Sequence, residues 1–396
     1  MLFESRVRVE QDVAYHSETF FNYLDRSARP EMGRVRDLLE EWFAHYPNRP
    51  AASTNVASLR EKLRGQFRSR RKRQQIEAFW ELYLHESLVR AGAHVTVRSD
   101  TPDFDVEFEG GHLALEATVR GLSDADTGAE ARVQVFRDAI DRVQAGEWIL
   151  DVCVQKESSR PPKAASLCRE VEAWVQALDV DAVRENCEKA PSAALERLPM
   201  REFSRDGWHV QVRAIPKRKG VQRTGRLPAI GVWGGAVVQV SNSEAVASAL
   251  AAKASRLRAM RGGRPLIVAV LVDREFADED DIEEALFGSS GLVLATDARG
   301  AVAGRTERAG NGLWSPGGRA GGHIDAVLAA VGLDPCRVAG CAPMLWTNPS
   351  RHQAPLSIPR ELPWNQCWHD VVGRRVQPAA VSAGRFFGIS EGWPME

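Results

Sequence analysis

The stretch that decides the fold consists of three segments, FWELYLHESLVRAG (79–92), TPDFDVEF (101–108) and LALEATV (113–119). Apolar residues at helical spacing, followed by Gly92, predict a helix over 74–91 that ends at a glycine cap. Residues 93–98 alternate as a strand, and the two later segments alternate around Gly110-Gly111, which indicates a hairpin. The chain therefore reads helix, strand, strand, strand, with tight connections.

Further elements follow at a distance. Residues 243–260 predict a helix with Ser243 as N-cap, and PLIVAVLV (265–272) is a continuous apolar run typical of a central strand. Together these segments predict an α/β protein whose mixed β-sheet is flanked by helices. The predicted parts are a helical N-terminal extension (1–66), a core (67–120 and 243–332, with a further strand at 323–331), an insertion (121–242) and an irregular C-terminal tail (333–396).

The composition is that of an ordinary globular protein. Of 396 residues, 44% are hydrophobic and 27% are charged, which excludes disordered and collagen-like classes. Lys and Arg number 52 against 53 Asp and Glu, so the net charge of −1 argues neither for nor against a nucleic-acid partner. No apolar run approaches the roughly 18 residues that span a bilayer, and the N-terminus lacks an apolar signal core. We therefore expect a soluble, cytoplasmic protein with reduced thiols.

Three carboxylates stand at positions that suggest chemistry. Asp103 follows Pro102 at the start of one predicted strand, and Glu116 lies in the next strand, across the glycine turn. Because antiparallel neighbours are roughly 5 Å apart, these two side chains can converge. Glu81 lies on the preceding helix. Oxygen ligands of this kind suit a hard divalent cation, which can activate water and neutralise charge on a phosphate.

This pattern resembles the PD-(D/E)XK (restriction-endonuclease-like) nuclease superfamily, whose core is helix, three strands, helix, strand. The resemblance rests on PD-x(12)-E-x-T after a Glu-bearing helix. The three segments also look like those of a set of uncharacterised bacterial proteins with that core. Other segments match the set too, namely EEWFAHYP, ALAAKASRLRAM…RPLIVAV, EEALFG and LWTNP, so that the resemblance covers most of residues 30–350. It implies a nuclease-like core with a large insertion and terminal extensions.

The resemblance also implies roles for particular residues. Asp103 and Glu116 would bind Mg²⁺ or Mn²⁺, and Glu81 would assist directly or through water. The sequence departs from the family at Thr118, where the superfamily most often has a lysine that orients water and stabilises charge. In some members the lysine has moved to the second core helix, where Lys253 is the candidate, and Lys217 and Lys219 are weaker ones.

Two basic stretches are candidates for contacts with nucleic acid. The first leads into the helix that bears Glu81, and a cationic arm there would hold a phosphate backbone across the metal pocket. The second lies in the insertion, between Trp208 and Trp233, where stacking on bases is conceivable but core packing is the more common role. A solvated linker is the alternative for the first stretch. The selected residues are Arg68, Arg70, Arg71, Lys72, Arg73, Lys217, Arg218 and Lys219.

Each candidate has an alternative interpretation. Glu81 would be a solvated helix residue paired with His85, and Glu77 competes with it for the same role. Lysines such as Lys253 are more often surface residues than catalytic ones. A zinc site has the wrong ligand spacing for common modules; its ligands would be Cys336, Cys341, Cys367 and His369. P-loop, G-x-S-x-G and H-E-x-x-H motifs do not occur in the sequence.

The resulting functional expectation is a metal-dependent hydrolase, an endonuclease that cleaves phosphodiester bonds of nucleic acid, with DNA favoured over RNA. Association with the superfamily adds a bacterial defence role against foreign DNA. A homodimer or an unidentified protein partner is left open. The alternative is a catalytically inactive nuclease-like protein that binds nucleic acid or a protein partner, which Thr118 supports. A third is a structural module whose resemblance to nucleases is accidental.

Overall fold

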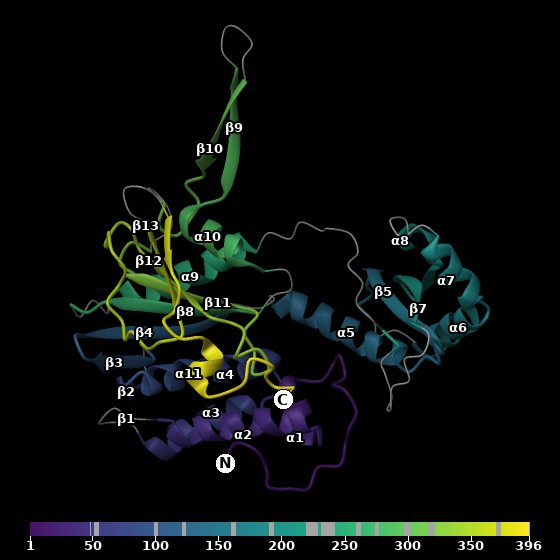
Figure 1. Ribbon diagram of the computed structural model, residues 1–396, viewed down its shortest axis with the longest axis horizontal. Coiled ribbons are helices and arrows are strands. Elements are labelled where there is room, and N and C mark those ends of the chain that lie inside the picture. The colour runs from purple at the N-terminus through teal and green to yellow at the C-terminus, as the bar shows by residue number, and fades with distance from the viewer. Residues whose placement is uncertain are drawn as a thin grey trace. The chain divides into compact units, whose positions relative to one another are not determined.

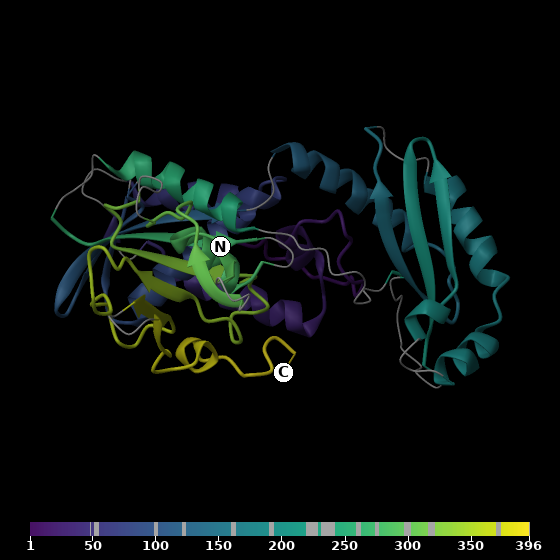
Figure 2. The same ribbon diagram turned by 90° about the horizontal axis from the view of Figure 1, so that it is seen from above.

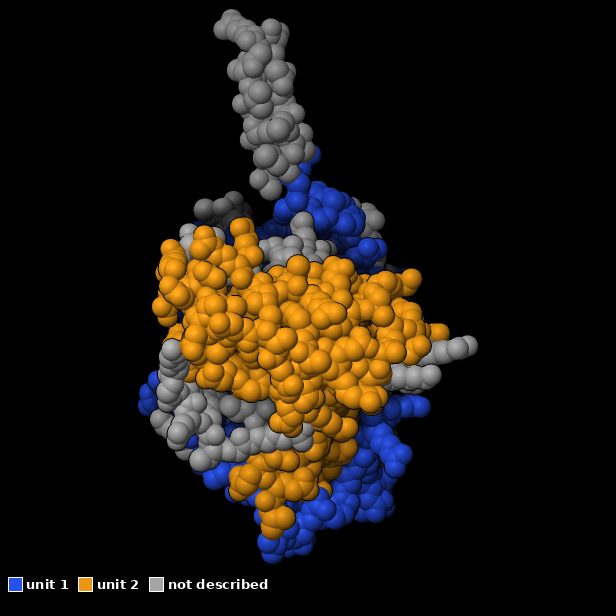
Figure 3. Space-filling model, turned by 90° about the vertical axis from the view of Figure 1, so that its right-hand side faces the viewer, with its two compact units in different colours: residues 1–8, 28–121, 239–396 blue, residues 9–27, 122–238 orange. Residues whose placement is uncertain are grey.

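The computed structural model describes most of the chain, and every structural statement below concerns the residues that it describes. These are residues 1–47, 49–50, 55–98, 102–120, 124–159, 164–189, 194–218, 229–230, 242–258, 263–273, 277–296, 302–315, 321–369 and 374–395. They form two compact units, which Figure 3 colours separately. Unit 1 comprises residues 1–8, 28–121 and 239–396, and unit 2 comprises residues 9–27 and 122–238.

Unit 1 is built on a nine-stranded sheet with the order β1-β2-β3-β4-β8-β11-β12-β13-β14 (Figure 1). Its strands are β1 (Arg49–Pro50), β2 (His94–Val97), β3 (Phe104–Phe108), β4 (Gly111–Arg120), β8 (Leu266–Val272), β11 (Ala326–Val331), β12 (Met344–Thr347), β13 (Asn365–His369) and β14 (Arg374–Gln377). The β2, β3 and β4 strands pair antiparallel, whereas β4, β8 and β11 pair parallel. The prediction of an α/β protein with a mixed sheet is confirmed.

Helices cover both faces of this sheet (Figure 1). The helices of unit 1 are α2 (Pro30–His45), α3 (Val56–Phe67), α4 (Lys72–Arg90), α9 (Ser243–Leu257), α10 (Glu279–Phe287) and α11 (Ala383–Phe387). On one face, the indole of Trp80 in α4 donates a hydrogen bond to the carbonyl of Ala269 in β8 (3.1 Å). On the other face, Val268 and Val270 of β8 pack in the apolar cluster that contains the buried residues of α9. The prediction that helices flank the sheet is confirmed.

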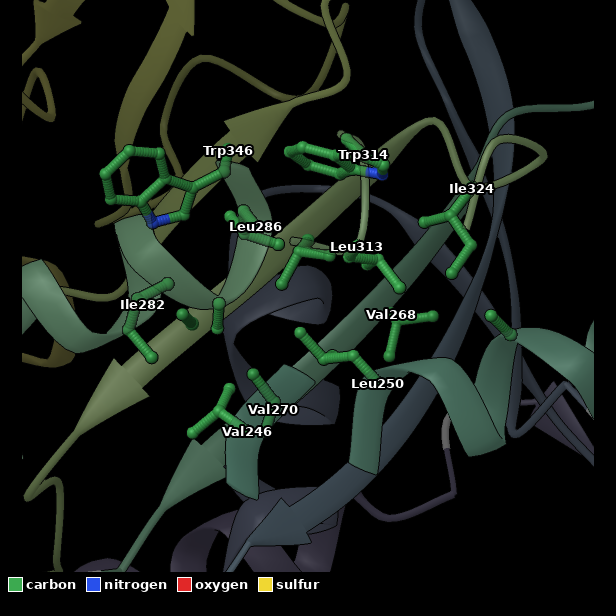
Figure 4. Packing of buried hydrophobic residues seen from close by; sticks show 14 of the residues in the cluster. Val246, Leu250, Val268, Val270, Ile282, Leu286, Leu313, Trp314, Ile324 and Trp346 are labelled. Carbon is green, nitrogen blue, oxygen red and sulfur yellow. The ribbon is translucent and has the colours of Figure 1, made fainter. Parts of the chain in front are cut away.

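The α9 face carries an extensive apolar core. The cluster in Figure 4 includes Val246, Leu250, Val268, Val270, Ile282, Leu286, Leu313, Trp314, Ile324 and Trp346. Val246, Leu250 and Leu257 recur at helical spacing on α9 and are fully buried, which fixes the helix against β8. Along the chain, α4, β2, β3 and β4 come first, and α9 and β8 follow after the strands and helices of unit 2. This packing determines where the side chains of β3, β4 and α9 meet.

Unit 2 contains the sheet β5-β7-β6, with strands β5 (Trp148–Lys156), β6 (Met200–Arg205) and β7 (Trp208–Pro216). Its helices are α1 (Phe20–Arg26), α5 (Asp124–Ile140), α6 (Ala164–Gln176), α7 (Val180–Glu188) and α8 (Ala194–Arg197). Leu167, Val171 and Val175 of α6 are buried in the core of this unit, and Figure 2 shows helices along one face of its sheet. Residues 9–27 belong to this unit because His16 and Ser17 bind the Asp138 carboxylate of α5.

Two parts of the predicted domain organisation need correction. The tail at 333–396 is not irregular, because it supplies β12, β13 and β14 to the main sheet and ends in α11. Strands of four or five residues depend on pairing with neighbours rather than on a local pattern, which explains why the sequence did not reveal them. The segment 1–66 is not one extension, because residues 9–27 join unit 2 and the remainder joins unit 1.

Two further features complete the fold. The strands β9 (Ser290–Thr296) and β10 (Val302–Arg308) pair only with each other among the described residues and form a separate hairpin (Figure 1). Within the described ranges, no helix combines the length and the apolar character that crossing a membrane requires.

Candidate functional site

Asp103 and Glu116 lie side by side, as expected from the pairing of two strands across the Gly110-Gly111 turn. The register pairs Phe104 of β3 with Leu115 of β4, so the preceding residue, Asp103, lies opposite Glu116. The backbone N–H of Asp103 donates to Oε2 of Glu116 (3.2 Å), and the N–H of Ala117 donates to Oδ2 of Asp103 (2.8 Å). Each carboxylate is therefore held by the backbone of the other strand, and the two form one site.

Lys253 of α9 completes an ion pair with Glu116. Its Nζ lies 2.5 Å from Oε1 of Glu116. The Glu116 side chain is 5% exposed and that of Lys253 is 23% exposed, so the pair is largely shielded from water. The burial of Leu250, Ala254 and Leu257 against β8 positions this part of α9. The ammonium group thus reaches the carboxylate from the helix rather than from the strand.

Thr118 stands two residues after Glu116 on β4 and pairs with Val270 of β8. By the alternation of a strand, Thr118 lies on the same face of the sheet as Glu116. Its hydroxyl carries no charge, so the charge beside Glu116 comes from Lys253 instead. The structure therefore brings Lys253 to the carboxylate pair, whereas Lys217 belongs to unit 2 and Lys219 lies outside the described residues.

Glu81 of α4 is held by a residue that the sequence analysis did not select. The hydroxyl of Tyr46, which follows α2, donates to Oε1 of Glu81 at 2.5 Å. The His85 ring, four residues further along α4, is buried and packs edge-on against the Tyr46 ring at 5.0 Å. The rival carboxylate, Glu77, forms an ion pair with Arg73 (3.0 Å).

The three carboxylates lie close enough for their charges to affect one another's pKa values. Burial, together with the charges of Glu116 and Glu81, raises the pKa of Asp103 to about 7, and the N–H of Ala117 and the charge of Lys253 oppose this rise. Burial also raises the pKa of Glu81, as do the charges of Glu77 and Glu116. The Tyr46 hydrogen bond and the charge of Lys62 offset part of that rise. Burial and mutual repulsion of these carboxylates thus outweigh the effect of the cations near them on the pKa of Asp103 and on that of Glu81.

The donor set fits a hard divalent cation. Oδ1 of Asp103 accepts no hydrogen bond from the described residues, and Oε2 of Glu116 lies on the Asp103 side of its carboxylate. Mg²⁺ keeps several water ligands and commonly takes only one or two carboxylates from the protein, so this pair provides enough oxygen ligands. In the described part of the chain, no three His, Cys, Asp or Glu side chains stand close enough to hold a metal ion. Binding here would therefore rely on Asp103, Glu116 and water, with Glu81 reaching the ion through water.

The basic residues selected from the sequence divide into paired and exposed groups. Arg68 donates to the carbonyl of Leu2 (3.1 Å), and Lys72 forms an ion pair with Asp273 (3.2 Å). Arg70 and Arg71 are exposed, and neither has an ion-pair partner among the described residues. In unit 2, Nζ of Lys217 donates to the carbonyl of Gly146 (2.7 Å), while Arg218 is exposed and Lys219 lies outside the described residues.

Other interpretations of the sequence find little in the structure. Trp208 is 1% exposed in the core of unit 2, which rules out base stacking in this conformation, and Trp233 lies outside the described residues. The proposed zinc ligands do not come together as a group within the described ranges. Burial raises the pKa of the Cys336 thiol to about 12 and that of Cys341 to about 11, which disfavours the thiolate form that zinc binds.

Sequence reasoning missed Tyr46 and Lys62. Both come from the part of the chain treated as an extension, and both influence Glu81. Lys62 belongs to the first basic stretch, the basic tract of residues 60–73, but nothing in its spacing indicates that it faces a carboxylate. Tyr46 lies in the EEWFAHYP segment, where an aromatic residue beside proline predicts no particular contact.

A scan against models of protein families found no match, and searches of curated proteins and of solved structures found none either. Functional conclusions therefore rest on the geometry and electrostatics of this site.

Proposed function

We propose that the protein is a metal-dependent nuclease of the PD-(D/E)XK type, which hydrolyses phosphodiester bonds of nucleic acid. The observation that carries this proposal is the contact of Lys253 with Glu116, beside Asp103. Two carboxylates and an ammonium group in one shielded site, at the edge of a hairpin, combine metal ligands with a cation for transition-state charge. A purely structural role would more simply pair each carboxylate with its own cation.

The roles of the residues follow from their contacts. Asp103 and Glu116 would hold Mg²⁺ or Mn²⁺, which when bound would supply an activated water and neutralise phosphate charge. Lys253, at 2.5 Å from Glu116, would orient the attacking water and stabilise the negative charge that develops on the phosphate. Glu81 holds a further water molecule. The N–H of Ala117 fixes the direction of the Asp103 carboxylate.

Substrate contacts come from the exposed cations of the basic tract. Arg70 and Arg71 precede α4, the helix that carries Glu81, and they are free to bind phosphates. We propose DNA rather than RNA as the substrate, cleavage within the strand, and a role in bacterial defence against foreign DNA. These last points rest on the resemblance in sequence and not on any contact described above.

A second candidate function is favoured by two observations. Thr118 stands where the superfamily usually has a lysine, and the described residues contain no ready-made three-ligand metal site. A nuclease-like protein without catalysis, which binds nucleic acid or a protein partner, would have this appearance. Lys253 separates the two candidates, because a binding protein does not need its ammonium group at Glu116.

A cleavage assay tests the proposal directly. Single- and double-stranded DNA and RNA are incubated with Mg²⁺, Mn²⁺ or EDTA, and the wild type is compared with Asp103→Ala. The matched control is Glu109→Ala, which removes an exposed carboxylate from the same hairpin. We expect metal-dependent cutting by the wild type and the control, and none by Asp103→Ala.

Calorimetry with Mn²⁺ separates the two candidates. We expect binding by the wild type and its loss in Glu116→Gln. Cutting that survives Asp103→Ala would contradict the assignment of the site. Salt-sensitive binding of nucleic acid without Mn²⁺ binding or cutting would favour the inactive protein.

A further inference from the structure

Tyr46 occupies a position that several elements fix independently. It follows the end of α2, and its backbone N–H bonds to the carbonyl of Phe43 (3.3 Å). The guanidinium of Arg60 in α3 binds the carbonyl of Tyr46 at 2.5 Å and that of Ala44 at 2.6 Å. The ring packs edge-on against His85 of α4, and the residue is 1% exposed. Residues from three helices thus hold one phenol in place.

The only hydrogen bond that the Tyr46 hydroxyl makes to a described residue is the bond to Oε1 of Glu81 (2.5 Å). A phenol is a neutral donor, and burial beside Glu81 and Asp103 moves its pKa far above the usual range, so it remains protonated. The hydroxyl can therefore direct the carboxylate without cancelling its charge. A lysine or arginine at this place would form an ion pair and would compete with a metal ion.

We propose that Tyr46 is a positioning residue, which holds Oε1 of Glu81 and leaves Oε2 as the oxygen that faces the metal site. This inference rests on the proposed function, since it concerns how Glu81 serves the site formed by Asp103 and Glu116. It gives the α2–α3 segment a part in the site, which the description of residues 1–66 as an extension does not. It also implies that Glu81 contributes through one oxygen, not both.

A double-mutant cycle on Mn²⁺ affinity tests this inference. Tyr46→Phe keeps the ring that packs on His85 and removes only the hydroxyl. We expect it to weaken Mn²⁺ binding about tenfold, because a hydrogen bond to a charged group is lost. If Tyr46 acts through Glu81, the double variant Tyr46→Phe/Glu81→Gln binds Mn²⁺ as weakly as Glu81→Gln alone. A general loss of structure would instead weaken the double variant further.

Tyr83→Phe is the matched control, because it removes another buried tyrosine hydroxyl, this one from α4, the helix that carries Glu81, and we expect its Mn²⁺ affinity to equal that of the wild type. A spectroscopic measurement is independent of these affinities. The chain has four tyrosines, so labelling their ζ carbons with ¹³C gives four signals that single Tyr→Phe variants assign. We expect Glu81→Gln to shift the signal of Tyr46 and to leave that of Tyr83 in place.

The outcomes distinguish this inference from the proposed function. If the wild type binds Mn²⁺ and Tyr46→Phe binds it equally well, the positioning role is wrong while the metal site stands. If the signal of Tyr46 does not respond to Glu81→Gln, the hydrogen bond itself is refuted. If the wild type binds no Mn²⁺, the proposed function fails, and the positioning role fails with it.

Discussion

Two of the carboxylates on the helix α4, Glu81 and Glu86, have surroundings that differ in a way that separates a structural group from a candidate functional one. Two adjacent residues at the end of α2 contact these carboxylates. Nδ1 of His45 lies 2.9 Å from Oε2 of Glu86, and the hydroxyl of Tyr46 lies 2.5 Å from Oε1 of Glu81. Glu86 also receives Nε of Arg90 at 2.5 Å, and its side chain is fully buried. Glu86 therefore has a cation of its own, whereas Glu81 has a neutral hydroxyl.

The comparison shows how local charge balance distinguishes the two roles. A buried carboxylate with its own arginine is compensated, and loss of Glu86 would leave Arg90 with only its more exposed partner, Glu41. The cluster of Asp103, Glu116 and Glu81 has Lys253 as the one cation in direct contact with its carboxylates among the described residues. Excess negative charge costs stability unless a cation binds, which is the condition expected of a metal site.

The largest expected effect comes from removing the cation at each site, which is Lys253 beside Glu116 and Arg90 beside Glu86. Lys253→Met should reduce metal-dependent cleavage about 100- to 1,000-fold, because the transition state loses a fixed charge. Arg90→Met is the matched control and should lower thermal stability while the rate per folded molecule stays at the wild-type value. Rates are measured on one DNA substrate with Mg²⁺.

This prediction also probes which lysine serves the site. Unchanged cleavage in Lys253→Met would remove Lys253 from the mechanism and break the distinction between the two regions. Rate losses of equal size in both variants would do the same.

The next effect concerns the free energy of unfolding. Glu86→Gln should destabilise the protein by about 1–3 kcal/mol, because Arg90 loses its buried counter-charge and keeps only the exposed Glu41. Glu81→Gln should change stability much less and weaken Mn²⁺ binding instead. Urea denaturation and calorimetry measure the two quantities on the same samples. If Glu86→Gln lowered Mn²⁺ affinity as much as Glu81→Gln does, the distinction between a structural Glu86 and a functional Glu81 would be wrong.

A third prediction follows from the pKa of Asp103, which is raised from 3.8 to about 7 in the folded protein. A raised pKa favours folding fully below 3.8, and that contribution is lost as the pH rises to about 7. Above about pH 7, the folded protein must hold an ionised Asp103 in a buried site beside other carboxylates, which costs stability. Asp103→Asn removes this cost and keeps an oxygen for the N–H of Ala117. Without metal, we therefore expect the variant to be more stable than the wild type by about 1–3 kcal/mol at about pH 8.

The advantage of Asp103→Asn should shrink as the pH falls toward about 4. Urea denaturation across this pH range measures it. Saturating Mn²⁺ should reverse the order at about pH 8, because the metal stabilises the wild type alone. An advantage that is independent of pH would show that burial and like charge do not act on Asp103 as described.

Much of the fold and part of the site follow from local sequence signals. The hairpin at Gly110-Gly111 sets the register that places Asp103 opposite Glu116, and strand alternation with turn glycines is a short-range code. Lys253 was found differently, since its helix was read from periodicity but its role came from the resemblance. Its contact with Glu116 spans 137 residues, which no local pattern encodes.

The remaining features depend on contacts between distant segments. Tyr46 meets Glu81 because α2 packs on α4, and neither residue reveals this in its own neighbourhood. The short strands β12 and β13 exist because β11 offers an edge, so their residues read as irregular in isolation. Residues 9–27 join unit 2 through Asp138, a carboxylate that looks like any other on a surface helix. Such pairings require tertiary information.

The smallest expected effect extends the comparison to cations. Arg70 and Arg71 are exposed without an ion-pair partner among the described residues, whereas Arg73 is paired with Glu77. Each phosphate contact contributes about 0.9 to the slope of log affinity against log salt. Arg70→Ser/Arg71→Ser should therefore weaken DNA binding a few-fold per residue and lower that slope by up to about 2.

Arg73→Ser is the control and should change DNA binding and the slope less, because the charge of Arg73 is already partly neutralised by Glu77. Fluorescence anisotropy at several salt concentrations gives both quantities. A larger slope change in Arg73→Ser than in the double variant would mean that pairing in the free protein does not decide which cations bind phosphate.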